Sequence, residues 1–129
     1  MSKIKNHREL RVWQDSVNLS LKLYEITEHF PKYEVFGLSS QIQRAGVSIP
    51  ANISEGFGRG RMKEYLQFLR IAAGSLSEID TLVEIAVRRH YIDNLTYNEL
   101  LSEIVFLSKR LTSQRNALRN SVTSEQPTT

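Results

Sequence analysis

Residues 62–89 read MKEYLQFLRIAAGSLSEIDTLVEIAVRR, and apolar side chains recur along this stretch in steps of four and three residues. Such steps place side chains on one face of an α-helix, which has 3.6 residues per turn. That face comprises Tyr65, Leu69, Ala72, Leu76, Ile79, Val83 and Ala86. A second apolar stripe beside it comprises Phe68, Ile71, Leu82 and Ile85. Two stripes give this helix more apolar surface than a monomeric bundle can cover, so the pattern predicts an oligomer.

Three further segments show the same helical spacing on either side of this stretch. Apolar positions recur from Val12 to Phe30, from Leu38 to Phe57 and from Tyr97 to Leu118. We expect helices over residues 11–29, 34–59, 62–89 and 97–119, followed by a frayed, disordered tail over 120–129. The connections are short and period-two alternation nowhere persists. The predicted fold is therefore all-α, an antiparallel up-down-up-down four-helix bundle in one domain.

Two positions inside the expected helices disfavour helical structure, and one pair of residues marks the start of a helix. Pro50 lies within the second helix, and its ring would press on the carbonyl of Gly46, so we expect one kinked helix there. Gly74 lies within the third helix, where a close approach of a neighbouring helix is the expected reason for a glycine. Thr96, followed three residues later by Glu99, predicts a capping box at the start of the fourth helix.

The composition limits the possible function classes. The chain has 129 residues, of which 40% are hydrophobic and 24% are charged, as is usual for a globular domain. It has no cysteine, which excludes disulfides, thiolate metal sites and a cysteine nucleophile. It also shows no apolar leader and no apolar run of membrane-spanning length. We therefore expect a soluble, cytoplasmic protein.

A polar stripe accompanies the apolar face of the second helix. It mixes amides, a hydroxyl and opposite charges instead of repeating Glu and Lys as a solvated face does. Its members are Gln41, Arg44, Ser48, Asn52, Glu55 and Arg59. Glu78 of the third helix could face Glu55. These residues predict a structural polar network within the bundle or between subunits, and a ligand-binding role is the alternative.

Groups that could catalyse a reaction are scarce in the sequence. His29 and His90 are expected at the C-terminal ends of helices, where the helix dipole accounts for a histidine. They would lie at the same end of the bundle, but no Glu-x-x-His pair accompanies them to support a metal site. Glu55 and Glu78 lack a histidine or metal partner for hydrolysis. We therefore expect no catalytic residue, no cofactor and no metal.

The stretch GFGRGRMK, residues 56–63, invites comparison with phosphate-binding loops. It lacks the Gly-x-x-x-x-Gly-Lys-Ser/Thr order and follows a helix instead of a strand, so it does not predict a nucleotide site. The plain interpretation is a turn between two helices, with glycine at the helix end. In the functional alternative, Arg59, Arg61 and Lys63 offer a phosphate site at the start of the third helix.

The expected topology also sorts charges by end, within a chain of net charge +3. One end combines the N-terminal segment, the turn between the second and third helices, and the end of the fourth helix. It collects Lys3, Lys5, Arg8, Arg11, Arg59, Arg61, Lys63, Lys109, Arg110, Arg115 and Arg119 against four acidic residues, whereas the opposite end has four basic residues against eight acidic ones. An anionic partner at the basic end is one interpretation, and colloidal solubility is the other. The candidate nucleic-acid contacts are Arg8, Arg11, Arg59, Arg61, Lys63, Arg110 and Arg115.

The stretch FGLSSQIQRAGVSIPANISEGFGR, residues 36–59, resembles the signature of a bacterial family. Leu10, Val12, Trp13 and Gln14 precede it, and Glu64-Tyr65, Phe68-Leu69, Ala72, Gly74-Ser75-Leu76 and Glu78 extend the match. The family comprises four-helix-bundle proteins first noticed as reading frames in intervening sequences of 23S ribosomal RNA genes. The resemblance implies an up-and-down bundle assembled as a homopentameric ring. It also implies kinship with the basic accessory proteins of diversity-generating retroelements, which associate with nucleic acid and a reverse transcriptase.

From these features we expect a non-enzymatic, homo-oligomeric bundle whose basic end contacts the backbone of RNA or DNA through counterion release. The alternative is a protein-interaction scaffold that binds a partner enzyme, such as a reverse transcriptase, without touching nucleic acid.

Overall fold

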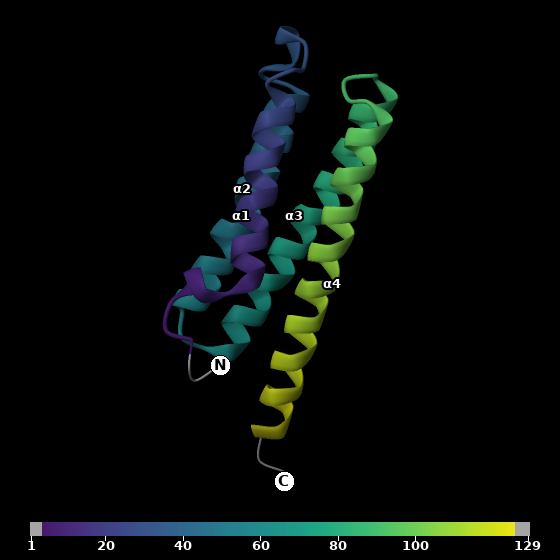
Figure 1. Ribbon diagram of the computed structural model, residues 1–129. Coiled ribbons are helices and arrows are strands. Elements are labelled where there is room, and N and C mark those ends of the chain that lie inside the picture. The colour runs from purple at the N-terminus through teal and green to yellow at the C-terminus, as the bar shows by residue number, and fades with distance from the viewer. Residues whose placement is uncertain (1–3, 126–129) are drawn as a thin grey trace.

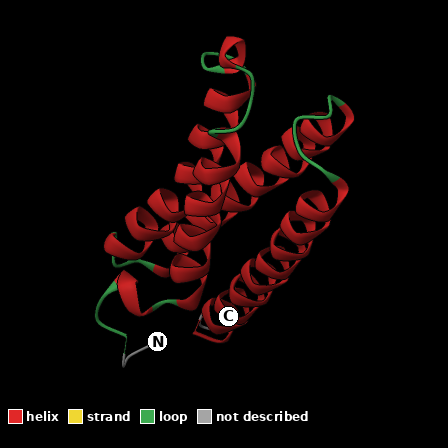
Figure 2. Ribbon diagram, turned by 45° about the horizontal axis from the view of Figure 1, so that its top comes forward, coloured by secondary structure: helices red, strands yellow, loops and turns green. Residues whose placement is uncertain are grey.

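The computed structural model describes residues 4–125, which form four α-helices and two short 3-10 helices (Figure 1). The elements are η1 (His7–Glu9), α1 (Arg11–Thr27), η2 (Lys32–Glu34), α2 (Leu38–Gly58), α3 (Met62–Arg88) and α4 (Asn94–Glu125). Within this range every regular element is helical (Figure 2). Each helix packs against the next along the chain, and α1 meets α4 over a smaller contact. The chain is an all-α, up-down four-helix bundle, as the apolar spacing predicts.

Both ends of the bundle are assembled from segments far apart in the sequence. The start of α1, the α2–α3 turn and the end of α4 lie at the bottom of Figure 1, and the other two connections lie at the top. We call the first the basic end and the second the acidic end, after the charges that the sequence assigns to them. This arrangement is the one that the alternating helix directions require.

The core lies between the apolar faces of the four helices. Leu23, Ile49, Leu69, Ile79 and Leu111 are fully enclosed, and each comes from a position in the expected helical spacing. Burying one such side chain contributes about 1.5–3 kcal/mol to folding. Of the second stripe on α3, Leu82 is also buried, whereas Ile71 and Ile85 are exposed.

The connection between α1 and α2 differs from the expected helix bounds of 11–29 and 34–59. Helix α1 ends at Thr27, whose hydroxyl donates a hydrogen bond of 2.8 Å to the carbonyl of Leu23. Helix α2 begins at Leu38, and the Glu34 carboxylate caps it from outside by accepting a 3.0 Å hydrogen bond from the Leu38 amide. The expected start of this helix at residue 34 is therefore wrong, because an acidic residue just before a helix can either continue the helix or cap its first turn.

Helix α4 is longer than the expected 97–119 in both directions. It begins at Asn94, and Asp93 Oδ1 accepts a 2.8 Å hydrogen bond from the Thr96 amide, so Asp93 takes the capping role predicted for Thr96. It continues through Glu125, so the expected frayed tail is wrong for residues 120–125. No glycine or proline interrupts the chain there before Pro127. The remainder of the expected tail, 126–129, lies outside the described residues.

The glycines mark where helices approach closely. Helix α2 continues through Pro50 as one helix, and a Cβ on its Gly46 would lie 3.0 Å from Leu23 Cδ1 of α1. A Cβ on Gly56 would lie 2.5 Å from the Cβ of Phe68 on α3. A Cβ on Gly74 would meet nothing within 4 Å, so the close approach expected there does not occur within the chain. Glycine costs about 1 kcal/mol relative to alanine inside a helix, and at Gly74 the described chain offers no compensation.

None of the helices between residues 4 and 125 combines the length and the apolar character that crossing a lipid bilayer requires.

Candidate nucleic-acid interface

The basic end brings together cations from the N-terminal segment and the α2–α3 turn. Helix η1 packs against α1 and α2, which places Arg8 and Arg11 at the end of the bundle that holds the α2–α3 turn. Arg59 and Arg61 flank this turn, and Lys63 lies in the first turn of α3. All five side chains are exposed. Lys3, also expected here, lies outside the described residues. The predicted grouping at the turn and the N-terminal segment is therefore present in the fold.

Two of the turn arginines are paired with carboxylates of the same chain. Arg59 Nη2 donates a 2.8 Å hydrogen bond to Glu55 Oε1, one helical turn earlier in α2. Arg61 Nε lies 3.8 Å from Glu64 Oε2 at the start of α3. Within residues 4–125, Lys63 and Arg11 form no ion pair. Arg8 also has no ion pair within these residues, so a phosphate that binds here would meet three cations without a carboxylate partner and would compete with carboxylates for two others.

Aromatic rings support two guanidinium groups at this end. The Arg8 guanidinium lies 5.2 Å from the centre of the Trp13 ring, and the Arg59 guanidinium lies 5.2 Å from the centre of the Phe68 ring. His7 packs edge-on against Trp13, with ring centres 5.0 Å apart. Such cation–π contacts hold the charged groups close to the bundle. Because these side chains are already partly ordered, they lose less conformational entropy when a ligand binds.

The two predicted contacts on α4 are less accessible. Arg110 Nε lies 3.2 Å from Asp15 Oδ2 of α1, and its guanidinium lies 4.6 Å from the centre of the Phe106 ring. Arg115 is half-buried, and its Nε has no hydrogen-bond partner among the described residues. Arg110 therefore connects α4 to α1, where it lines a pocket with Arg11.

Tyr65 lies buried at the start of α3, a few residues after the turn. Its hydroxyl is enclosed beside Gln114 without a satisfied hydrogen bond in the described part of the chain. Burial raises the pKa of Tyr65 to about 12, and Gln114 opposes this shift. The hydroxyl therefore stays protonated at neutral pH. The apolar spacing identifies Tyr65 as a core residue but gives no signal for its unpaired hydroxyl.

The structure joins part of the predicted polar network. Ser48 Oγ lies 2.9 Å from Ser75 Oγ on α3, and the Asn52 amide donates to the carbonyl and hydroxyl oxygens of Ser48 at 2.7 and 3.0 Å. Sequence reasoning did not assign Ser75 to the network, and its one signal was its position beside Gly74. The remaining members, Gln41, Arg44 and Glu78, are exposed, and their side chains make no hydrogen bond or ion pair within residues 4–125. Glu55 pairs with Arg59 and has no contact with Glu78.

The acidic end carries exposed apolar side chains on an ordered connection. Tyr91 donates a 2.8 Å hydrogen bond to Glu34 Oε2, and its hydroxyl oxygen lies 3.1 Å from that of Tyr33. Beside these contacts Phe36 is 97% exposed and Leu95 is 69% exposed. His29 and His90 are also exposed at this end. Among residues 4–125, no group of three or more His, Asp or Glu side chains is arranged to hold a metal ion.

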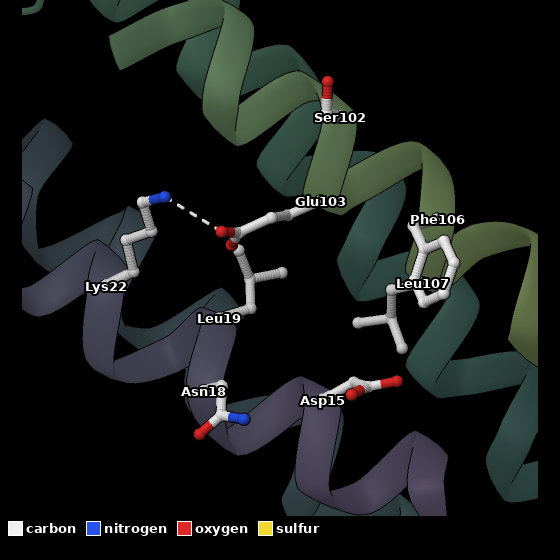
Figure 3. Close-up of a pocket in the computed structure, with 8 residues that line it drawn as sticks. All are labelled: Asp15, Asn18, Leu19, Lys22, Ser102, Glu103, Phe106 and Leu107. Carbon is white, nitrogen blue, oxygen red and sulfur yellow. Dashed lines mark hydrogen bonds and ion pairs between the residues drawn. The ribbon is translucent and has the colours of Figure 1, made fainter.

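A groove of about 480 Å³ separates α1 from α4 (Figure 3). Its floor is apolar, with Leu19 and Leu107, and Phe106 forms one wall. Lys22 Nζ donates a 2.8 Å hydrogen bond to Glu103 Oε1 across the groove, and this bond raises the pKa of Lys22. The charged groups on the groove walls are thus already paired: Lys22 is neutralised by Glu103, and Asp15 pairs with Arg110. The groove does not extend the cationic surface.

The comparisons with known proteins concern the family and the fold. Residues 8–113 match the sequence profile of a family described as 23S rRNA-intervening sequence protein. The fold is similar to the 1.70 Å crystal structure of a protein with unknown function from the S23 ribosomal protein family from Bacteroides thetaiotaomicron VPI-5482. The TM-score is 0.76 and the sequence identity 24%, with 81% of this chain and 95% of that chain covered. At this identity the likeness establishes the four-helix fold alone. No curated protein matches the chain.

Proposed function

The chain belongs to the 23S rRNA-intervening sequence protein family, and from this premise we propose a non-enzymatic, homo-oligomeric bundle whose basic end binds the phosphate backbone of RNA or DNA. The observation that carries the proposal is the gathering of five exposed cations from two separate segments at one end of the fold: Arg8, Arg11, Arg59, Arg61 and Lys63. Such a group of cations favours binding to a phosphate backbone, because each phosphate that it neutralises releases counterions.

The arrangement favours backbone contact over the reading of base sequence. The five cations lie around a helix-to-helix turn and a short 3-10 helix, so no helix or strand presents a row of side chains that could enter a groove. Contacts to phosphate position a protein without selecting a sequence. We therefore assign general affinity for nucleic acid to this end.

Self-association would strengthen the attraction. Exposed apolar residues on α3, among them Ile71 and Ile85, support an oligomer, and the family resemblance implies a homopentameric ring. In a ring with cyclic symmetry all subunits point the same way, so the basic ends meet on one face. The screening length at physiological salt is about 8 Å, which limits what a single end can attract. Neighbouring basic ends would form a continuous surface for a longer stretch of backbone.

The test removes the turn cations and compares them with an equal charge change at the other end. The first variant is Arg59→Gln, Arg61→Gln and Lys63→Gln, and the control is Lys32→Gln, Arg88→Gln and Arg89→Gln. Both variants lose three positive charges, and all six side chains are exposed. Binding to a fluorescent single-stranded RNA of mixed sequence would be measured by anisotropy from 50 to 200 mM salt.

We expect the turn variant to bind more weakly, with a salt slope reduced by about 2–3 if all three cations contact phosphate. The control should retain the slope of the parent protein. Glu55→Gln provides a further test. It removes the carboxylate that pairs with Arg59 at 2.8 Å, so this variant should bind the RNA more tightly than the parent protein. Equal affinities for the turn variant and the control, or no binding by the parent protein at 50 mM salt, would overturn the proposal.

A second candidate function is a protein-interaction scaffold, and the acidic end favours it. Phe36 is almost fully exposed on a connection held by Glu34, which caps α2 and accepts a hydrogen bond from Tyr91. An exposed aromatic side chain on an ordered loop is typical of a protein-binding anchor. In this case Phe36→Ala would abolish binding of a partner enzyme, while the turn variant would leave it unchanged.

A further inference from the structure

A pocket of about 330 Å³ lies at the basic end, between the segment that leads into α1 and the second half of α4. Its volume is within the range of small-molecule sites, which begins at about 300 Å³. Apolar side chains, among them Leu10 and Val12, form part of its lining. The hydrogen-bond donors in the lining are Arg11, Arg110, Ser113 and Gln114. We call this space the arginine pocket.

The donors of the arginine pocket come from two segments far apart in the sequence. Arg110, Ser113 and Gln114 are spaced by three and four residues on α4, so their side chains share one face of that helix. Arg11 contributes from the first turn of α1, and its side chain has no ion pair within residues 4–125. Two guanidinium groups, a hydroxyl and an amide therefore surround one space, which suits an anion with several acceptor oxygens.

The carboxylates near this pocket leave its arginines available. Glu9 also lines the pocket, but its Oε2 accepts hydrogen bonds of 2.9 Å from the amides of Lys5 and Asn6. Arg110 Nε lies 3.2 Å from Asp15 Oδ2, yet the two atoms are not aligned for a hydrogen bond, and neither has another partner within residues 4–125. A guanidinium carries five N–H donors, so Arg110 can bind a further acceptor while it stays beside Asp15.

A buried hydroxyl behind the pocket supports a ligand that accepts a hydrogen bond from Gln114. Tyr65 is 3% exposed, and its hydroxyl lies beside Gln114 without a satisfied hydrogen bond within residues 4–125. An amide side chain donates through its nitrogen and accepts through its oxygen. If the Gln114 nitrogen donates to an anion in the pocket, its oxygen is left to accept the Tyr65 hydroxyl hydrogen. The same ligand would then satisfy a buried donor.

We propose that the arginine pocket binds a phosphomonoester, either the terminal phosphate of a nucleic-acid strand or that of a free nucleotide. A phosphomonoester carries a charge of about −1.5 to −2 at pH 7, which two arginines neutralise, whereas a backbone phosphate carries a single charge. The apolar part of the lining suits the nucleoside attached to that phosphate. This inference rests on the proposed binding of nucleic acid at the basic end and adds a preference for strand ends.

The test compares short single-stranded RNAs of one sequence that differ only at their ends. One carries hydroxyls at both ends, one a 5′-phosphate and one a 3′-phosphate, and each has the same internal fluorophore. The parent protein should bind at least one phosphorylated RNA about tenfold more tightly than the hydroxyl-ended RNA, as an added charge-assisted hydrogen bond provides. Calorimetry with adenosine monophosphate distinguishes the two sources: binding of this nucleotide alone assigns the pocket to nucleotides, and its failure to bind assigns the pocket to strand ends.

Two variants remove donors from the pocket, and each has a matched control. Arg11→Gln should remove most of the tenfold preference, and Ser113→Ala should reduce the preference without changing the net charge. Arg88→Gln at the acidic end and Ser108→Ala elsewhere on α4 make the same substitutions at exposed positions outside the pocket and should retain the preference. Because the preference is a ratio of two affinities of one variant, a general loss of affinity or of folded protein cancels.

The outcomes separate this inference from the proposed function. Equal affinities of the parent protein for all three RNAs, without binding of adenosine monophosphate, would overturn the pocket and leave backbone binding intact. A parent that binds a phosphorylated RNA but not the hydroxyl-ended RNA at 50 mM salt would support the pocket and overturn general backbone binding. A preference that both Arg11→Gln and Ser113→Ala retain in full would place the terminal phosphate elsewhere and overturn the assignment.

Discussion

The hydroxyl oxygens of Ser48 and Ser75 lie 2.9 Å apart and connect the middle of α2 to α3. Ser48 Oγ also accepts a hydrogen bond from the Asn52 amide, which leaves the Ser48 hydroxyl hydrogen available to Ser75. The three side chains form a small chain of hydrogen bonds in an otherwise apolar contact. Because hydrogen bonds require specific geometry, this contact restricts sliding of α2 along α3 more than apolar packing alone would.

Removal of the Ser75 hydroxyl should measure the strength of this contact. We expect Ser75→Ala to lower the free energy of unfolding by about 1 kcal/mol relative to a control, Ser77→Ala, on the same helix. The exposed control reports the gain in helix propensity that both changes share. Urea unfolding followed by circular dichroism gives both values. Equal stabilities of the two variants would mean that water replaces the bond without loss.

The close approach at Gly56 should not tolerate a methyl group. A Cβ there would lie 2.5 Å from Phe68 Cβ, which is fixed to the α3 backbone and cannot rotate away. Gly56→Ala should therefore destabilise the fold by about 1–3 kcal/mol. Gly58→Ala, where a Cβ meets nothing within 4 Å, should leave stability unchanged or slightly raised. Thermal unfolding of the two variants side by side would show the difference, and similar midpoints would contradict the packing described here.

Glycines also show how far the sequence alone can be interpreted. Apolar spacing predicted all four helices and nearly all of the core, because a period of 3.6 residues is a local property. The different roles of Gly56 and Gly74 could not be predicted in this way, because they depend on which helix lies opposite. The same limit applies to Arg59 and Arg110: their charge is visible in the sequence, whereas their pairing with Glu55 and Asp15 depends on rotamers and on helix packing.

The acidic end should show a pH dependence that Glu34 partly controls. The amide of Leu38, and then the hydroxyl of Tyr91, lower the pKa of Glu34 below its ordinary value of 4.5. A lowered pKa in the folded state means that the ionised carboxylate stabilises the fold above about pH 4.5, and this stability is lost as the pH falls through the folded-state pKa. Glu34→Gln should therefore lose less stability than the parent protein between pH 6 and pH 3.

The control for this pH experiment is Glu28→Gln, an exposed glutamate whose side chain has no hydrogen bond within residues 4–125. It should follow the parent protein through the same pH range. Melting temperatures measured at half-unit intervals would be sufficient. If the curves of Glu34→Gln and of the parent stay parallel, the charge of the Glu34 carboxylate does not contribute to stability.

Truncating a core side chain should lower the free energy of unfolding less beside the α1–α4 groove than in the enclosed centre of the bundle. Leu69 and Leu107 are both buried, but Leu107 also lies on the floor of the open groove of about 480 Å³. Leu69→Ala should cost nearer 5 kcal/mol and Leu107→Ala nearer 2, within a range of about 2–5 kcal/mol, because solvent and neighbouring side chains can enter a site that opens to the surface. Denaturant unfolding would compare them, and the reverse order would show that α1 and α4 pack tightly in solution.

The limited contact between α1 and α4 also has a consequence for motion. Helix α4 is held along α3, and its connection to α1 depends in part on the ion pairs Lys22–Glu103 and Asp15–Arg110. Proteins open locally where buried apolar contact is least. Backbone amides of α4 should then exchange with deuterium before those of α2 and α3, and salt should speed that exchange by weakening the ion pairs. The bundle would thus behave as a stable three-helix unit with a fourth helix that detaches and returns.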